Sequence, residues 1–108
     1  MTVSMMIINP ADQIERTFHV PVLDQNAFDE VVLPVSRSLD LNIISLFETG
    51  TNVSNNDLDI VENQLRTMLN SIPKTDKRYD HIVSRTTRVI DEMRSVFEQN
   101  AGAILFIG

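Results

Sequence analysis

The chain has 108 residues, a hydrophobic fraction of 43%, a net charge of −6 and no cysteine. This length and composition predict one compact domain, residues 1–108, that buries its own core. The lack of cysteine excludes disulfide scaffolds, thiol catalysis, zinc ribbons and iron–sulfur clusters. The negative charge argues against binding to nucleic acid or to an anionic membrane.

The first predicted element is a hairpin over residues 3–20. Residues 3–8 are mostly apolar, residues 13–20 alternate between apolar and polar side chains, and the four residues between them are typical of a type I turn. Residues 1–8 lack the basic segment and apolar length of a signal peptide, and no stretch approaches the roughly 20 apolar residues of a membrane span. We therefore expect a cytoplasmic protein without membrane contact.

A helix is predicted from Asp24, which can cap it, to Leu39. It should kink or break near Leu33, because Pro34 removes a backbone hydrogen bond and clashes with the preceding turn. Residues 41–47 have apolar side chains on both faces of an extended chain and predict a mostly buried strand. Strand, helix and strand with short joints predict a right-handed parallel crossover.

A loop is predicted over residues 48–56, which include Gly50 and several small polar residues. Ser54 and Asp57 then resemble a capping box, and apolar residues at helical spacing predict a helix that Pro73 closes. The short joint that follows predicts an antiparallel pair with the next helix.

The last third of the chain predicts the longest helix and a buried strand. Apolar rows at steps of three and four predict a helix from Thr75 or Asp76 to about Asn100, with Gly102 left-handed beyond it. Residues 103–107 are apolar throughout, which is typical of a strand covered on both faces. Ile104 and Phe106 are therefore predicted to lie inside a sheet or at a subunit interface.

Together these elements predict an α/β or α+β domain in the order β-β-α-β-α-α-β, with a four-stranded mixed sheet and three helices. A sheet face that receives no helix needs another cover, and the simplest candidate is a second copy of the chain, giving a homodimer.

We predict no catalytic, cofactor or metal site. His19 and His81 lie on the polar sides of their elements, and no nucleophile motif or phosphate-binding glycine run accompanies them. The acidic segment from Asn52 fails as a calcium loop, because its sixth and twelfth positions hold Asp57 and Asn63 in place of Gly and Glu. These observations argue against an enzyme.

Two sets of charged residues are candidates for partner binding, although a solvated helix surface is the more ordinary interpretation of both. Spacing places a basic set on one stripe of the long helix: Arg78, His81, Arg85 and Arg88. An acidic set is suited to a basic partner: Glu48, Asp57, Asp59 and Glu62.

The sequence favours a small acidic, non-enzymatic protein-binding module, most of all an inhibitor of another protein, whether immunity-like, antitoxin-like or phage-encoded. Two alternatives stay open. One is a structural or regulatory subunit of a homo- or hetero-oligomer that extends a sheet through its last strand. The other is a small-molecule-binding protein or minor enzyme with a pocket along residues 48–57. A co-purifying protein, a clean homodimer or a bound metabolite would separate the three.

Overall fold

The computed structural model describes residues 2–108 and has an α+β fold built on a four-stranded sheet. The strands are β1 (Thr2–Ile7), β2 (His19–Asp24), β3 (Thr51–Val53) and β4 (Leu105–Ile107). Their spatial order is β2-β1-β4-β3, and every neighbouring pair is antiparallel. The predicted mixed sheet and parallel crossover are therefore wrong.

The prediction of three helices is also wrong, because two short helices occupy residues assigned to strands. The helical segments are α1 (Gln13–Arg16); a continuous run of α2 (Gln25–Ala27), a π-helical turn (Phe28–Val32) and α3 (Leu33–Ser38); α4 (Asn42–Ser45) with a 3₁₀ turn (Leu46–Glu48); a 3₁₀ turn (Asn55–Asp57) leading into α5 (Leu58–Ser71); and α6 (Tyr79–Gln99). No helix within residues 2–108 is long and apolar enough to cross a membrane.

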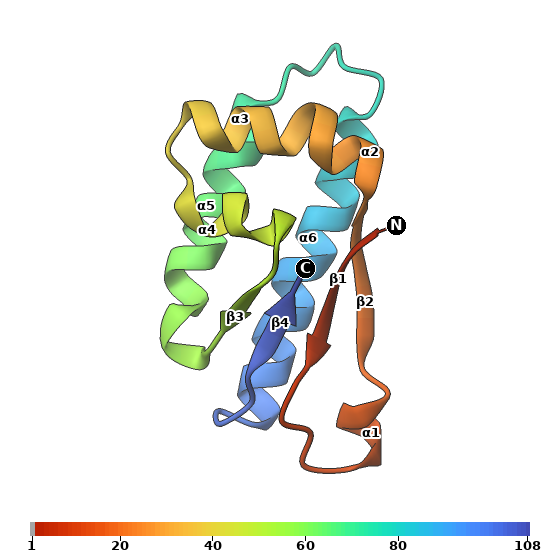
Figure 1. Ribbon diagram of the computed structural model, residues 1–108, viewed down its shortest axis with the longest axis vertical. Helices are drawn as coiled ribbons and strands as arrows, with labels where there is room; N and C mark the ends of the chain where they lie inside the picture. Colours follow the sequence, from red (N-terminus) through yellow and green to blue (C-terminus); the bar gives the residue numbers. More distant parts are fainter. Residues whose placement is uncertain (1) are drawn as a thin grey trace.

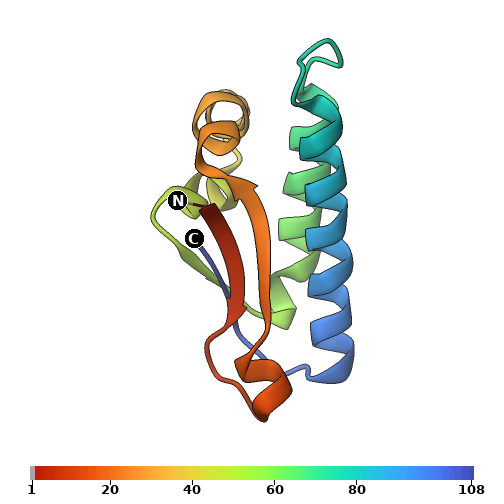
Figure 2. The same cartoon turned by 90° about the vertical axis from the view of Figure 1, so that its right-hand side faces the viewer.

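The helices cover the sheet unequally. The antiparallel pair α5 and α6 lies along one face of the sheet. Helices α2 and α3 cross the upper end of the sheet (Figure 1). Seen from the side, most of the other face has no helix against it (Figure 2). The strands contribute Met5, Val53 and Leu105, all fully buried, to the core that α5 and α6 share with the sheet. The sheet therefore has one packed face and one open face.

Strands β1 and β2 pair as an antiparallel hairpin, as predicted, but the second strand runs over His19–Asp24 and not over residues 13–20. Residues 13–16 are helical instead of extended. Oδ1 of Asp12 accepts a hydrogen bond from the backbone N–H of Glu15 at 2.8 Å, and Oε1 of Glu15 accepts one from that of Ala11 at 3.0 Å. These bonds satisfy free donors at the start of α1. The alternation of apolar and polar residues wrongly predicts a strand here, and Ile14, an apolar residue of that pattern, is 80% exposed.

Pro34 is accommodated by a wider helical turn and causes no break. The N–H of Leu33 donates to the carbonyl of Phe28, five residues earlier, which is the π-helical pattern. This turn ends just before Pro34, whose ring would clash with the carbonyl of Glu30 in a regular α-helix. The irregularity predicted near Leu33 is thus a π-helical turn in a continuous helix.

The predicted strand over residues 41–47 is wrong, and the third strand lies in the predicted loop. The N–H groups of Asp40 and Leu41 donate to the carbonyls of Arg37 and Ser36, with Asp40 left-handed at φ 55°, so α3 ends in a Schellman motif. The chain then turns straight into α4, which buries Ile44, while the 3₁₀ turn that follows buries Phe47. Leu41, Ile44 and Phe47 are spaced by three, so this apolar run also fits a helix.

The C-terminal half of the chain follows the prediction more closely. Helices α5 and α6 pack as an antiparallel pair, although α6 begins at Tyr79 and not at Thr75 or Asp76 (Figure 1). The carboxylate of Asp76 instead accepts a hydrogen bond from the backbone N–H of Arg78, at 2.8 Å. Strand β4 lies between β1 and β3, as expected of an interior strand. Its predicted two-sided burial is wrong, because Phe106 is only partly buried.

Candidate functional site

Three of the four acidic candidates for partner binding are engaged within the chain. Glu48 forms an exposed ion pair with Arg37 at 3.2 Å. Oδ2 of Asp57 accepts hydrogen bonds from both the backbone N–H and the hydroxyl of Ser54, each at 3.0 Å, and the predicted capping box is confirmed. Asp59 is exposed on α5. Within residues 2–108, Asp59 alone of the four acids forms no ion pair or side-chain hydrogen bond, so the set is not a group of four free carboxylates.

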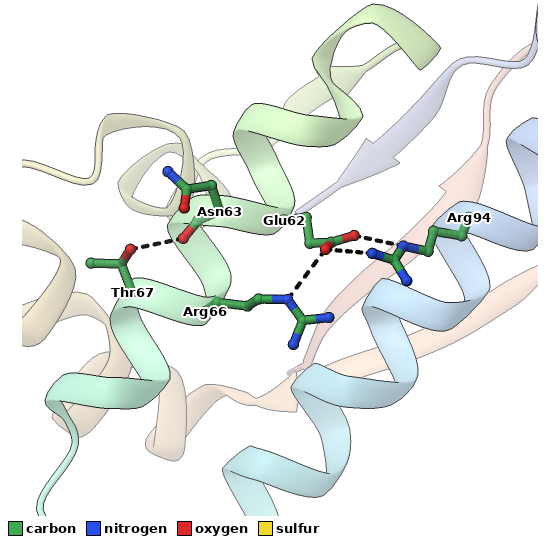
Figure 3. Close-up of polar contacts among 5 residues, drawn as sticks. All are labelled: Glu62, Asn63, Arg66, Thr67 and Arg94. Carbon is green, nitrogen blue, oxygen red and sulfur yellow. Dashed lines mark hydrogen bonds and ion pairs between the residues drawn. The ribbon is translucent and has the colours of Figure 1, made fainter.

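Glu62 is the most strongly held of these acids. Arg94 donates two hydrogen bonds to its carboxylate, at 2.6 and 2.7 Å, and Arg66 donates a third at 3.2 Å (Figure 3). Burial raises the pKa of Glu62, but the hydrogen bonds and charges of Arg94 and Arg66 together outweigh it, so this pKa lies below its ordinary value. The network joins α5 to α6, which gives Glu62 a structural role.

The Glu62→Gln variant should be less stable by about 1 kcal/mol at pH 7, because a charge-assisted pair becomes a neutral one. Since the folded-state pKa is lowered, this stabilisation is present above the ordinary value of 4.5 and is lost as the pH falls through the folded-state pKa. Urea unfolding across this pH range measures the difference. Glu98→Gln, an exposed control, should change stability by less than about 0.5 kcal/mol. A Glu62→Gln loss that persists in acid would contradict the ionic explanation.

The basic stripe is also partly engaged. Arg78 pairs with Glu30 at 2.5 Å and with Asp76 at 3.5 Å. The hydrogen bond to Glu30 raises the pKa of Arg78, and the hydrogen bond from the Arg78 backbone lowers the pKa of Asp76. His81 lies 3.9 Å from Asp24. The predicted stripe is therefore not a continuous row of free cations.

Two residues of the stripe, His81 and Arg85, lie beside the edge strand β2. Within residues 2–108, Arg85 and Arg88 form no ion pair. His81 and Arg85 line a small hollow of about 140 Å³ together with residues of β1 and β2, including the carboxylate of Asp24. Since this hollow contains both signs of charge, the stripe does not define an anion site by itself.

The open face of the sheet brings together residues that the sequence predicted as an interface, such as Phe106, and residues that it did not, such as Met6. Met6 of β1 lies opposite His19 of β2 on one side and Phe106 of β4 on the other, and Phe106 lies opposite Asn52 of β3. One row therefore crosses all four strands. Because side chains alternate along strands, Ile8 and Ile104 extend the apolar surface at the next position. Met6 is 37% and Ile8 47% exposed.

Phe106 is fixed in this open face by two glycines. A Cβ added to Gly50 would lie 2.7 Å from Cε2 of the Phe106 ring and closer still to Cζ, and one added to Gly108 would lie 3.0 Å from the ring. The ring therefore lies directly over the glycine backbone. An aromatic side chain held this way loses little freedom when a partner covers it.

The structure gives other predicted positions no comparable arrangement. His81 lies beside Asp24, at the opposite end of β2 from His19. Within residues 2–108 no group of three or more His, Cys, Asp or Glu side chains is suited to a metal. In the segment proposed for a pocket, Asn55 lines a shallow hollow with Leu58, Arg94, Phe97 and Glu98. Extension of a sheet through β4 is excluded, since β1 and β3 already pair with both of its edges.

One further hollow, which the sequence did not reveal, lies between α1 and the C-terminal half of α6. It has a volume of about 160 Å³. The lining residues come from the first strand, α1, the segment after it and α6: Ile7, Ile14, Glu15, Phe18, Glu92, Ser95, Val96 and Gln99. The Asp12 and Glu15 capping pattern is the sequence signal that could have located α1.

Comparison with known proteins returned no relative: no protein-family model, no curated protein and no solved structure matches this chain. What the chain does must therefore be inferred from its own residues.

Proposed function

We propose that this chain is a small, non-enzymatic module that binds another protein through the open face of its sheet. The observation that carries the proposal is the row of partly exposed apolar side chains, centred on Met6 and Phe106, on a sheet face without a helix. Contiguous apolar surface of this kind marks interaction sites in folded proteins. Phe106 is the expected anchor, because its ring is already held in place.

The charge of the chain indicates what kind of partner fits. The open row has no Asp, Glu, Lys or Arg, although the chain as a whole has a net charge of −6. An uncharged centre in an acidic protein suits a partner with an apolar patch and a basic surround, because the surrounding charges then attract. A second copy of the chain brings like net charges together and is the less favoured occupant.

Within this class, inhibition of the bound protein is the activity we propose, in the manner of immunity proteins, antitoxins or phage-encoded inhibitors. The small size and acidic charge of this chain support inhibition by analogy with such proteins. We also expect the binding to take place in the cytoplasm.

The test is partner capture from the native host with matched variants. A tagged protein carrying Met6→Ser and Phe106→Ser should lose a stoichiometric partner that the unmodified protein retains. Ile60→Ser removes a more exposed apolar side chain, 55% exposed against 37% for Met6, from α5 and should leave capture unchanged. Equal capture by all three proteins would overturn the proposed surface. A homodimer by native mass that Met6→Ser with Phe106→Ser dissociates would assign the open face to a second copy.

A further inference from the structure

The hollow between α1 and α6 combines an apolar floor with a negatively charged rim. Phe18 and Val96 contribute apolar walls, and Ile14 is 80% exposed at its edge. The half-buried carboxylates of Glu15 and Glu92 also line it. A volume of about 160 Å³ is below the range of a drug-sized pocket and suits a single side chain.

The two carboxylates are held in different ways. Glu15 is oriented by hydrogen bonds from the backbone N–H of Ala11 at 3.0 Å and from the side-chain amide of Asn100 at 3.2 Å. Glu92 forms no ion pair within residues 2–108, although Arg88 lies one helical turn away. The rim thus has one positioned carboxylate and one that is available to a ligand.

The direction of α6 adds to this negative potential. Ser95 and Gln99 lie in the last two turns of this helix, which ends at Gln99, and Glu92 lies just before them. The C-terminal end of a helix carries a partial negative charge, so a cation is favoured there. An apolar stem leading to a cationic head therefore matches the floor, the rim and the helix end together.

We propose that this hollow binds a lysine or arginine side chain of a partner protein. The methylene stem lies against Phe18 and Val96, and the cationic head lies between Glu15 and Glu92. That the bound side chain belongs to a partner protein rests on the proposed protein-binding function. The preference of the hollow for a cation with an apolar stem does not depend on that function. The hollow and the open sheet face would be two separate contacts.

The test uses chemical-shift changes in ¹⁵N-labelled protein titrated with Nα-acetyl-lysine methylamide and Nα-acetyl-arginine methylamide. We expect saturable shifts at Ile14, Phe18, Ser95 and Gln99, with a millimolar dissociation constant that weakens as salt is added. Nα,Nε-diacetyl-lysine methylamide, which lacks the charge, should bind at least about fivefold more weakly. The absence of saturable shifts, or equal binding of the uncharged analogue, would overturn the proposal.

Variants and a second probe locate the site and its source. Glu92→Gln should weaken lysine binding about fivefold, while Glu98→Gln, an exposed acid near the end of the same helix, should not. If both variants weaken lysine binding equally, the binding reflects the general negative charge of the protein and not the hollow, which would overturn the proposal. n-Butylammonium presents the lysine stem and head without a backbone. If it binds more tightly than the blocked lysine, the occupant is a free amine and the protein source is wrong. Loss of partner capture through the open sheet face leaves these titrations unaffected, so the two proposals fail separately.

Discussion

Leu105→Asp should prevent folding, whereas Phe106→Asp should give a folded protein. Leu105 is completely buried in the interior strand β4, so an aspartate there is an unpaired carboxylate in the core. Burial of such a group costs several kcal/mol, which is comparable to the whole stability of a domain of this size. Phe106, its neighbour, lies on the open face, where a carboxylate stays in contact with water.

Circular dichroism melts of the two variants measure this difference. Leu105→Asp should show no cooperative unfolding, and Phe106→Asp should retain a transition with a loss of about 1–2 kcal/mol, because the ring contacts with Gly50 and Gly108 are gone. A cooperative, stable Leu105→Asp variant would show that β4 is peripheral. An unfolded Phe106→Asp variant would show that something covers the open face in solution, as in an obligate dimer.

Gly50→Ala should destabilise the protein by about 2–4 kcal/mol. Gly50 has φ 103°, a left-handed conformation that residues with a Cβ rarely adopt, which costs about 1–2 kcal/mol. The added Cβ would also overlap the ring of Phe106 and force it out of position. Urea unfolding measures the loss, and the same variant should weaken binding through the open face.

A double-mutant cycle separates the two causes. In a Phe106→Ala background the steric part disappears, so Gly50→Ala should cost only the backbone strain. Gly102→Ala is the matched control, because its nearest neighbour, Oδ1 of Asn100, would lie at 3.4 Å and Gly102 is not left-handed, contrary to the sequence prediction. An equal loss from Gly50→Ala with and without the Phe106 ring would show that the ring is not packed against Gly50.

The accuracy of the sequence prediction followed the length of each pattern. The apolar rows of α5 and α6 extend over several turns and identify both helices, and the apolar run that ends at Ile107 identifies an interior strand. Residues 41–47 are too short to distinguish periods of two and three, and β3 has only three residues. At α1, the local capping bonds of Asp12 and Glu15 overrode the alternation.

The candidate site was predictable only where the apolar character of a residue selected it, although the predicted two-sided burial was wrong. Ile104 and Phe106 were selected for their apolar character, and the structure places them on the open face. The charged candidates depended on long-range partners that no spacing reveals. Arg94 lies 32 positions from Glu62, and Arg78 lies 48 positions from Glu30. Pairing at such separations is set by how α5, α6 and the π-helical turn pack together.

The pairing of β1 with β4 also determines when the fold can form. Ser4 and Gly108 exchange backbone hydrogen bonds at 3.1 and 3.0 Å, so segments from opposite ends of the described chain meet in the middle of the sheet. Closing so large a loop carries a high entropic cost before any contact compensates for it, which slows folding. During synthesis, β1 and β2 can pair early, but β3 has no strand partner and the four-stranded sheet cannot form until residues 105–107 leave the ribosome. A nascent chain halted before that point therefore exposes one edge of β1 to chaperones and to other unfolded chains.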